Sequence, residues 1–181
     1  MTRNQYQIKI SLKNSEPKIW RRIIVNSDIL LIDLHYIIQT TMGWDNYHGF
    51  QYKKNKEIYG IPSRDDWYTV HDIRKTKLGS LLQKEKQKLE YEYDFGDSWK
   101  HEIILEKILE YDQNEQIPRC IAGKMNCPPE DCGGIWGYDD LVRIMEGPQN
   151  KAYREMIDWI GEFDPEHFNM EEINIKLKNK F

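Results

Sequence analysis

The sequence predicts an α+β protein of one domain, residues 1–181. We expect a mainly antiparallel sheet packed with a long helix in the N-terminal half and a cluster of helices near the C-terminus. Segments with the two-residue alternation of half-buried strands come early in the chain, and segments with helical spacing come late, an order typical of this class. A length of 181 residues suits one well-cored domain, and no internal repeat or linker divides it.

The first two strands are predicted in YQIKISLK and KIWRRIIV, on either side of Pro17. In the first segment Tyr6, Ile8, Ile10 and Leu12 alternate with polar residues, so one face of this strand should be buried.

The long helix is predicted in DILLIDLHYIIQTTMGW, where apolar residues recur at spacings of three and four. Ser27 or Asp28 is available as its N-terminal cap, and Gly43 follows its last apolar residue. These apolar positions are Leu30, Leu31, Leu34, Ile37, Ile38 and Met42.

The middle of the chain predicts short strands in HGFQYKK and KEIYG and a short helix in LGSLLQKE. A hairpin follows, in which KLEYEYDF and WKHEIILEKIL flank the turn residues GDS. After a glycine-rich loop, helices are predicted in YDDLVRIMEG, KAYREMIDWIGEF and MEEINIKLKN. Asp139 and Asp140 suit the positive N-terminal end of the first of these three helices.

Composition and charge exclude several classes of protein. No apolar run approaches the roughly 20 residues that span a bilayer, and the N-terminus lacks the apolar core of a signal peptide. We therefore expect a cytoplasmic protein that makes no membrane contact and keeps its three cysteines reduced. The net charge of −4 does not favour nucleic acid, although residues 1–27 hold six Lys or Arg against one acid.

Several stretches in order along the chain resemble the plasmid Orf-three-like family. They are PKIWRRIIV, LIDLHYIIQTTMGWDNYH, YEYDFGDSWKHEI, CPPEDCGGIWGY and FDPEHFNMEEIN. The family is named from a root-inducing plasmid and includes passenger proteins of insertion elements, so the resemblance implies an α+β fold and an association with plasmids or transposable elements. Members often carry a second histidine two residues after the one that matches His48, and this chain has Phe50 there.

Some members of that family carry a transposon-resolvase label, which the residues of this chain do not support. A serine recombinase needs a nucleophilic serine among arginines that balance phosphate charge. The arginines here do not cluster around a serine in this way, and no helix-turn-helix pattern is present.

The loop CIAGKMNCPPEDCGG, residues 120–134, holds all three cysteines. Cys120, Cys127 and Cys132 together with His101 of WKHEI form a ligand set that suits tetrahedral zinc. The spacing Cys-x6-Cys-x4-Cys is wider than in zinc knuckles, so a turn-rich loop with inert buried thiols is an alternative interpretation. Redox chemistry of the thiols is a third.

A second candidate site depends on whether the hairpin turn and the cysteine loop converge. If they do, carboxylates and histidines from both could form a hydrolytic or hard-cation site. Its members would be His48, Asp94, Asp97, His101, Glu130 and Asp131. The alternative is that Asp97 only bonds backbone amides in its turn, and that Glu130 and Asp131 only cap the loop. His35 is expected on the surface of the long helix or at the edge of the core.

Two functions therefore remain open. The first is an accessory or binding protein of plasmids or mobile elements that acts on a protein partner, with zinc in the cysteine loop or no cofactor. The second is a metal-dependent hydrolase or nuclease that uses the cysteine loop, His101 and nearby carboxylates. A nucleic-acid contact through the basic N-terminal strands is a weaker alternative to a solvated face formed by Lys9, Lys13, Lys18, Arg21 and Arg22.

Overall fold

The computed structural model describes residues 4–181 and confirms the α+β class. Within this range, eight strands form one sheet in the order β5-β4-β3-β6-β7-β1-β2-β8, in which every pair is antiparallel except β4 and β5. The strands are β1 (Asn4–Leu12), β2 (Trp20–Asn26), β3 (Phe50–Lys54), β4 (Glu57–Gly60), β5 (Val70–Asp72), β6 (Lys88–Tyr93), β7 (Trp99–Glu110) and β8 (Arg119–Lys124). The helices are α1 (Leu31–Met42), α2 (Leu78–Leu81), α3 (Gly134–Glu146), α4 (Lys151–Ile160) and α5 (Met170–Lys180).

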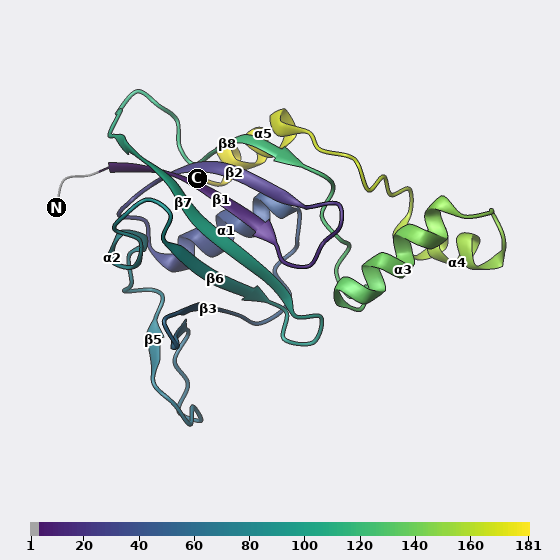
Figure 1. The fold of residues 1–181 in the computed structure, drawn as a ribbon, viewed down its shortest axis with the longest axis horizontal. Helices are drawn as coiled ribbons and strands as arrows, with labels where there is room; N and C mark the ends of the chain where they lie inside the picture. Colours follow the sequence, from purple (N-terminus) through teal and green to yellow (C-terminus); the bar gives the residue numbers. More distant parts are fainter. Residues whose placement is uncertain (1–3) are drawn as a thin grey trace.

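The core lies between the sheet and α1, which crosses one face of the sheet (Figure 1). Ile8, Ile10 and Leu12 of β1 are fully buried, as the alternation in the sequence predicts. On α1, Leu34 and Ile38 are likewise fully buried. The buried residues of the strand, which recur every two positions, and those of the helix, which recur every three or four, therefore pack together in one apolar layer.

A helix is present as α1 where the sequence predicts one, but it has 12 residues and is not long, and its start differs from the prediction. Gly43 ends it in a left-handed conformation with φ of 92°, a common glycine-assisted helix end. At the other end, Leu30 occupies the cap position and no side chain caps the helix, so the predicted cap by Ser27 or Asp28 is wrong. The Ser27 hydroxyl instead accepts a hydrogen bond from the backbone N–H of Asn4.

The sequence interpretation missed β5 and placed β8 inside a loop. Strand β5 has only three residues and pairs in parallel with β4, which leaves little alternation to detect. The first residues of the cysteine loop belong to β8, where Cys120 pairs with Ile23 of β2. Helix α3 already begins at Gly134, so Asp139 and Asp140 lie beyond its first turn.

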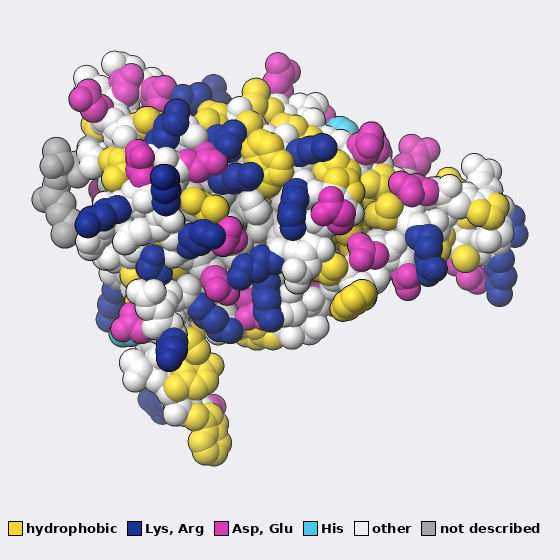
Figure 2. Space-filling view, viewed as in Figure 1, with side chains coloured by type: hydrophobic (Ala, Val, Ile, Leu, Met, Phe, Trp, Pro, Cys, Tyr) yellow, Lys and Arg dark blue, Asp and Glu magenta, His cyan; other side chains and the backbone are white. Residues whose placement is uncertain are grey.

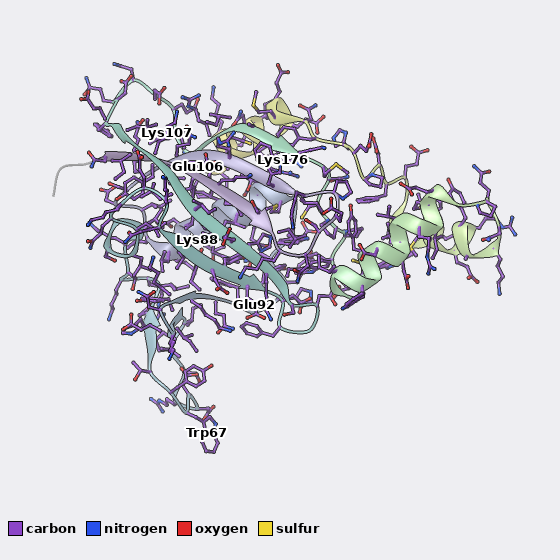
Figure 3. All side chains as sticks on the ribbon, viewed as in Figure 1. Trp67, Lys88, Glu92, Glu106, Lys107 and Lys176 are labelled. Carbon is purple, nitrogen blue, oxygen red and sulfur yellow. The ribbon has the colours of Figure 1, made fainter. Side chains whose placement is uncertain are left out.

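Two parts of the chain extend away from the sheet in Figure 1. Helices α3 and α4 form a pair beside the sheet, and the connection between β4 and β5 forms an arm with Trp67 at its tip (Figure 3). By contrast, α5 lies against β8, where the Asn174 side chain accepts from the backbone N–H of Cys120 and donates to its carbonyl.

Candidate functional site

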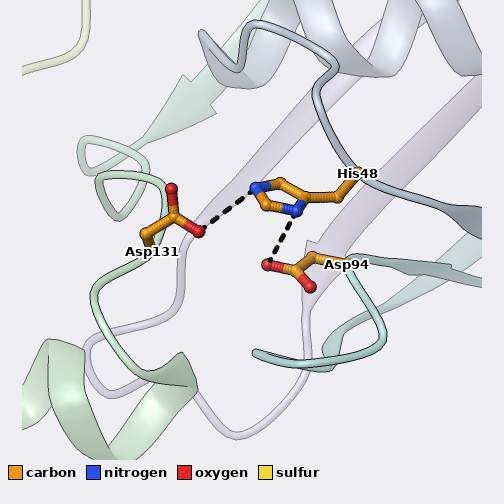
Figure 4. Close-up of side chains that lie close together, drawn as sticks. All are labelled: His48, Asp94 and Asp131. Atoms are coloured by element: carbon orange, nitrogen blue, oxygen red, sulfur yellow. Dashed lines mark ion pairs between the residues drawn. The ribbon is translucent and has the colours of Figure 1, made fainter.

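Three side chains from separate segments meet at one end of the β6–β7 hairpin (Figure 4). Nδ1 of His48 lies 3.8 Å from Oδ2 of Asp94, and Nε2 of His48 lies 3.2 Å from Oδ1 of Asp131. One ligand atom from each residue falls within 4.8 Å of the others. In residues 4–181 this is the single group of three or more histidine, cysteine or acidic side chains with that spacing.

The segment that carries His48 is held on both sides of the histidine. Before it, Asn46 Oδ1 lies 2.6 Å from Nε2 of the buried His35, and the backbone N–H of Tyr47 donates to the Tyr93 hydroxyl. After it, the carbonyl of Gly49 accepts from the backbone N–H of Asp94. These bonds fix the distance between His48 and the end of β6.

Asp94 is the first residue after β6 and has a left-handed backbone with φ of 56°. The Gly96 N–H donates to its Oδ1 at 2.8 Å, and the Ser98 N–H donates to its carbonyl at 2.6 Å. Its other carboxylate oxygen, Oδ2, faces His48. A non-glycine residue held in this region costs about 1 kcal/mol or more, and such residues cluster at functional sites.

Asp131 is brought to the site because the cysteine loop docks on the hairpin. The Trp44 indole N–H donates to the carbonyl of Pro128 at 3.0 Å, and the Tyr93 hydroxyl donates to Glu130 Oε1 at 2.5 Å. The N–H of Gly133 donates to Asp97 Oδ2 at 3.1 Å. The hairpin turn and the loop therefore converge, which was the condition set by the sequence interpretation.

The donor set is one imidazole and two carboxylates, a combination that suits borderline and hard divalent cations such as Zn²⁺, Mn²⁺ or Mg²⁺. The Asp94 side chain is 10% exposed, that of His48 28% and that of Asp131 69%. Three protein ligands on a partly open surface leave coordination positions for water or another ligand.

The remaining residues of the predicted acidic site make structural contacts. The Asp97 carboxylate accepts a hydrogen bond from the N–H of Gly133, so Asp97 links the hairpin turn to the start of α3. Glu130 accepts a hydrogen bond from the Tyr93 hydroxyl. Burial and, to a smaller extent, this hydrogen bond raise the pKa of Tyr93, so the hydroxyl stays protonated and can donate. Phe50, at the position where the resemblance implied a second histidine, stacks on His35 with ring centroids 3.4 Å apart.

The predicted thiolate set is not gathered into a comparable group in the described residues. Cys120 and Cys127 are buried, Cys132 is half-buried, and none of the three forms a disulfide. His101 is fully buried, with Nδ1 3.0 Å from the carbonyl of Trp99, and its Nε2 has no hydrogen-bond partner among residues 4–181. Zinc binding by these four residues stays a prediction.

Burial keeps the three thiols in the neutral form. It raises the pKa of Cys120 and of Cys127, and together with the charge of Asp97 it raises the pKa of Cys132 to about 12. The thiolate is the reactive form of cysteine. These surroundings therefore favour inert thiols over redox chemistry.

The sequence interpretation did not assign a role to His35 and Tyr93, which position the site. His35 Nδ1 lies 2.8 Å from the Tyr91 hydroxyl, and Nε2 faces an oxygen that only accepts, so the Nε2–H tautomer fits both contacts. Burial lowers the pKa of His35 to about 4, which keeps the ring neutral. Helical spacing places His35 four residues after Leu31 and three before Ile38, on the buried side of α1, and this was the signal available in the sequence.

The basic N-terminal strands do not form a continuous cationic surface. Successive residues of a strand point to opposite faces, so Arg21 is buried and bonds the carbonyls of Thr41, Trp20 and Lys124. Its predicted place on the solvated face is wrong. On the open face, Arg22 pairs with Glu106 at 2.5 Å.

Acids and bases are interspersed over this open face in Figures 2 and 3. Lys13 pairs with Glu90 at 3.0 Å, and Lys88 pairs with Glu102 at 2.9 Å. Each of these pairs offsets a base with an acid, which lowers the attraction of this face for a polyanion.

Comparisons with known proteins agree with the fold. The chain is 31% identical over 177 residues to the uncharacterized protein y4hQ of Sinorhizobium fredii (strain NBRC 101917 / NGR234), across 96% of this chain and 91% of that protein. A crystal structure of the protein of unknown function MM3350 from Methanosarcina mazei Go1 matches with a TM-score of 0.85 and 34% identity, over 95% of this chain and 97% of that one. No helix in residues 4–181 is long and apolar enough to cross a membrane. The family model of the plasmid pRiA4b ORF-3-like protein matches residues 4–172, and the chain therefore belongs to this family.

Proposed function

We propose that the chain is a cation-binding accessory protein of plasmids or mobile elements, with a divalent metal held by His48, Asp94 and Asp131. The observation that carries the proposal is the placement of one ligand atom from each residue within 4.8 Å of the others. The three ligands come from the segment after α1, from the hairpin turn and from the cysteine loop. A bound cation would tie these three segments together.

The bonds around the site support a preformed cation site. Asp94 is held by Gly49, Gly96 and Ser98, so its Oδ2 is oriented before any ligand binds. Preorganised ligands lose less entropy on binding. The exposed Asp131 is the least constrained of the three and would adjust to the metal.

The direct test is a titration of the purified, metal-free protein with Mn²⁺ and with Zn²⁺ by calorimetry. We expect about one equivalent of metal to bind to the wild-type protein. The affinity should be at least tenfold weaker in Asp131→Asn and in His48→Gln, because each change removes one of the three ligands. Asp65→Asn is the matched control, since this exposed aspartate lies in the distant β4–β5 arm.

A fourth variant separates this site from the predicted zinc set. If Cys127→Ser keeps the wild-type affinity while Asp131→Asn loses it, the metal belongs to the imidazole and carboxylate group. The reverse pattern assigns the metal to the cysteine loop and contradicts the proposal. Absence of binding by the wild-type protein with both metals also contradicts it.

A metal-dependent hydrolase or nuclease is the second candidate, favoured by the side chains that flank the ligands. Tyr47 and Phe95 adjoin His48 and Asp94, and they are 78% and 58% exposed. Aromatic rings exposed beside a metal are suited to stack on the bases of a nucleic acid, and open coordination positions can activate water. Hydrolysis of single-stranded oligonucleotides with Mn²⁺, lost in Asp131→Asn, would establish this activity, and no cleavage above that of Asp131→Asn would exclude it.

A further inference from the structure

A groove of about 730 Å³ lies between the helical pair α3–α4 and the body of the molecule. Its walls come from α3, from Tyr153 of α4, from residues 163–166 and from Glu16 and Pro17 of the β1–β2 connection. This volume is within the range of sites that hold a ligand or a short peptide segment. None of the ligands of the candidate cation site lines it.

The floor of the groove is apolar and adaptable. It includes Met125, Tyr138, Val142, Met145 and Phe163, of which Met125 and Tyr138 are buried. Methionine side chains are flexible and recur at surfaces that accept varied apolar groups.

Helix α4 contributes an apolar side that the chain itself covers only in part. None of its ten residues is buried, and Tyr153, Met156, Ile157 and Ile160 are half-buried. A helix with this pattern normally packs its apolar side against a partner. Tyr153 faces the groove, so an occupant would complete this contact.

The rim of the groove is acidic, with carboxylates at Glu16, Asp139, Glu146, Asp164 and Glu166. All five residues are exposed. In residues 4–181, none of these side chains belongs to an ion pair. Figure 2 shows acidic side chains gathered where the helical pair meets the body.

The single cation on the rim does not balance these acids. Arg143 pairs at 2.7 Å with Asp140, which lies outside the groove lining. The potential in the groove is therefore negative, and negative charge repels nucleic-acid phosphates and anionic lipids.

We propose that this groove binds a basic peptide segment of a protein partner, with an aliphatic or aromatic side chain on the floor and lysine or arginine side chains at the rim. The carboxylates are spread along the groove and do not converge within the spacing of metal ligands, so they suit several separated cations in place of one ion. An apolar anchor surrounded by complementary charge is the usual form of a peptide-binding site. The proposal supplies the partner chemistry of an accessory protein and does not depend on the cation site.

The test uses a fluorescent 12-residue peptide of alternating lysine and leucine, with an alternating glutamate and leucine peptide as its charge-reversed counterpart. We expect fluorescence anisotropy to show binding of the basic peptide by the full chain, at least tenfold weaker at high salt than at low salt. The acidic peptide should not bind.

Matched variants assign the binding to the groove. Asp139→Asn combined with Glu146→Gln should weaken the basic peptide at least tenfold, because both carboxylates lie on the rim. Glu155→Gln combined with Asp158→Asn removes the same number of charges from α4 outside the groove lining and should leave affinity unchanged. Met145→Gln should weaken binding without any change of charge.

Several results would overturn the proposal. These are equal loss of affinity in the rim and control variants, equal binding of the acidic peptide, or no binding of the basic peptide at low salt. Self-association of the chain in sedimentation experiments that the rim variant abolishes would assign the groove to a second copy. Because His48→Gln should bind the peptide normally, failure of the cation site and failure of the groove can be distinguished.

Discussion

At the scale of single residues, two buried histidines couple the stability of the protein to pH. Burial lowers the pKa of His35 to about 4 and that of His101 to about 3, below the value of about 6.5 for an unfolded chain. As the pH falls, the unfolded chain takes up these protons before the folded chain does. The part of the stability that depends on these two histidines is therefore complete above about pH 6.5 and decreases as the pH falls, toward about 4 for His35 and about 3 for His101.

We expect the free energy of unfolding to decrease between pH 6.5 and pH 5 by up to about 1.4 kcal/mol per pH unit for each of these histidines. Urea denaturation at several pH values measures this slope. His35→Gln and His101→Gln should each reduce the slope, because each removes one of the two protons. If the slope in both variants equals that of the wild type, other groups cause the loss of stability at acidic pH.

At the scale of elements, the contact between α3 and the hairpin turn depends on Gly134. Its φ is +69°, and a Cβ atom would lie 2.5 Å from the carbonyl oxygen of Asp97. Gly43, which ends α1 in the left-handed conformation, also has a positive φ, +92°, but has no atom within 4 Å of that position. Both glycines therefore have a positive φ, but only Gly134 lies close to the backbone of another segment.

Gly43→Ala should cost about 1 kcal/mol of stability, the usual cost of a left-handed non-glycine residue. Gly134→Ala should cost more and should also weaken cation binding, because the start of α3 must move away from the turn and carry Asp131 with it. Urea denaturation and a Mn²⁺ titration of both variants measure these effects. Equal stability and equal cation affinity in the two variants would show that the close approach is unimportant.

The elements also show how far the sequence predicts this structure. Strands with clear alternation, such as the one containing Ile8 and Ile10, and the hairpin around Tyr93 follow from local patterns. Strand β8 does not, because Cys120 and Gly123 give no alternating pattern and its pairing with β2 is a long-range contact. His48, Asp94 and Asp131 were all candidates, but the sequence grouped them with Asp97, Glu130 and His101. Only the docking of the loop on the hairpin separates these three gathered side chains from the residues that support them.

At the scale of the whole molecule, the charge distribution opposes binding to nucleic acid through the N-terminal strands. The net charge is −4, Arg21 is buried, and Arg22 is paired with Glu106. We expect no retention of duplex DNA at about 150 mM salt, where the Debye length is about 8 Å. Electrophoretic mobility shifts measure this. Salt-sensitive binding that Arg22→Ala weakens would show that the open face does contact phosphates.

The contact between Asn174 and Cys120 lies at the β8 edge of the sheet and covers it. The side-chain amide of Asn174 offers one acceptor and one donor to β8, the same pair of groups that a neighbouring strand would present. Helix α5 thus occupies the outer edge of the sheet in place of a further strand. Loss of this helix would uncover apolar surface and also leave an open hydrogen-bonding edge, to which a strand from another molecule can add.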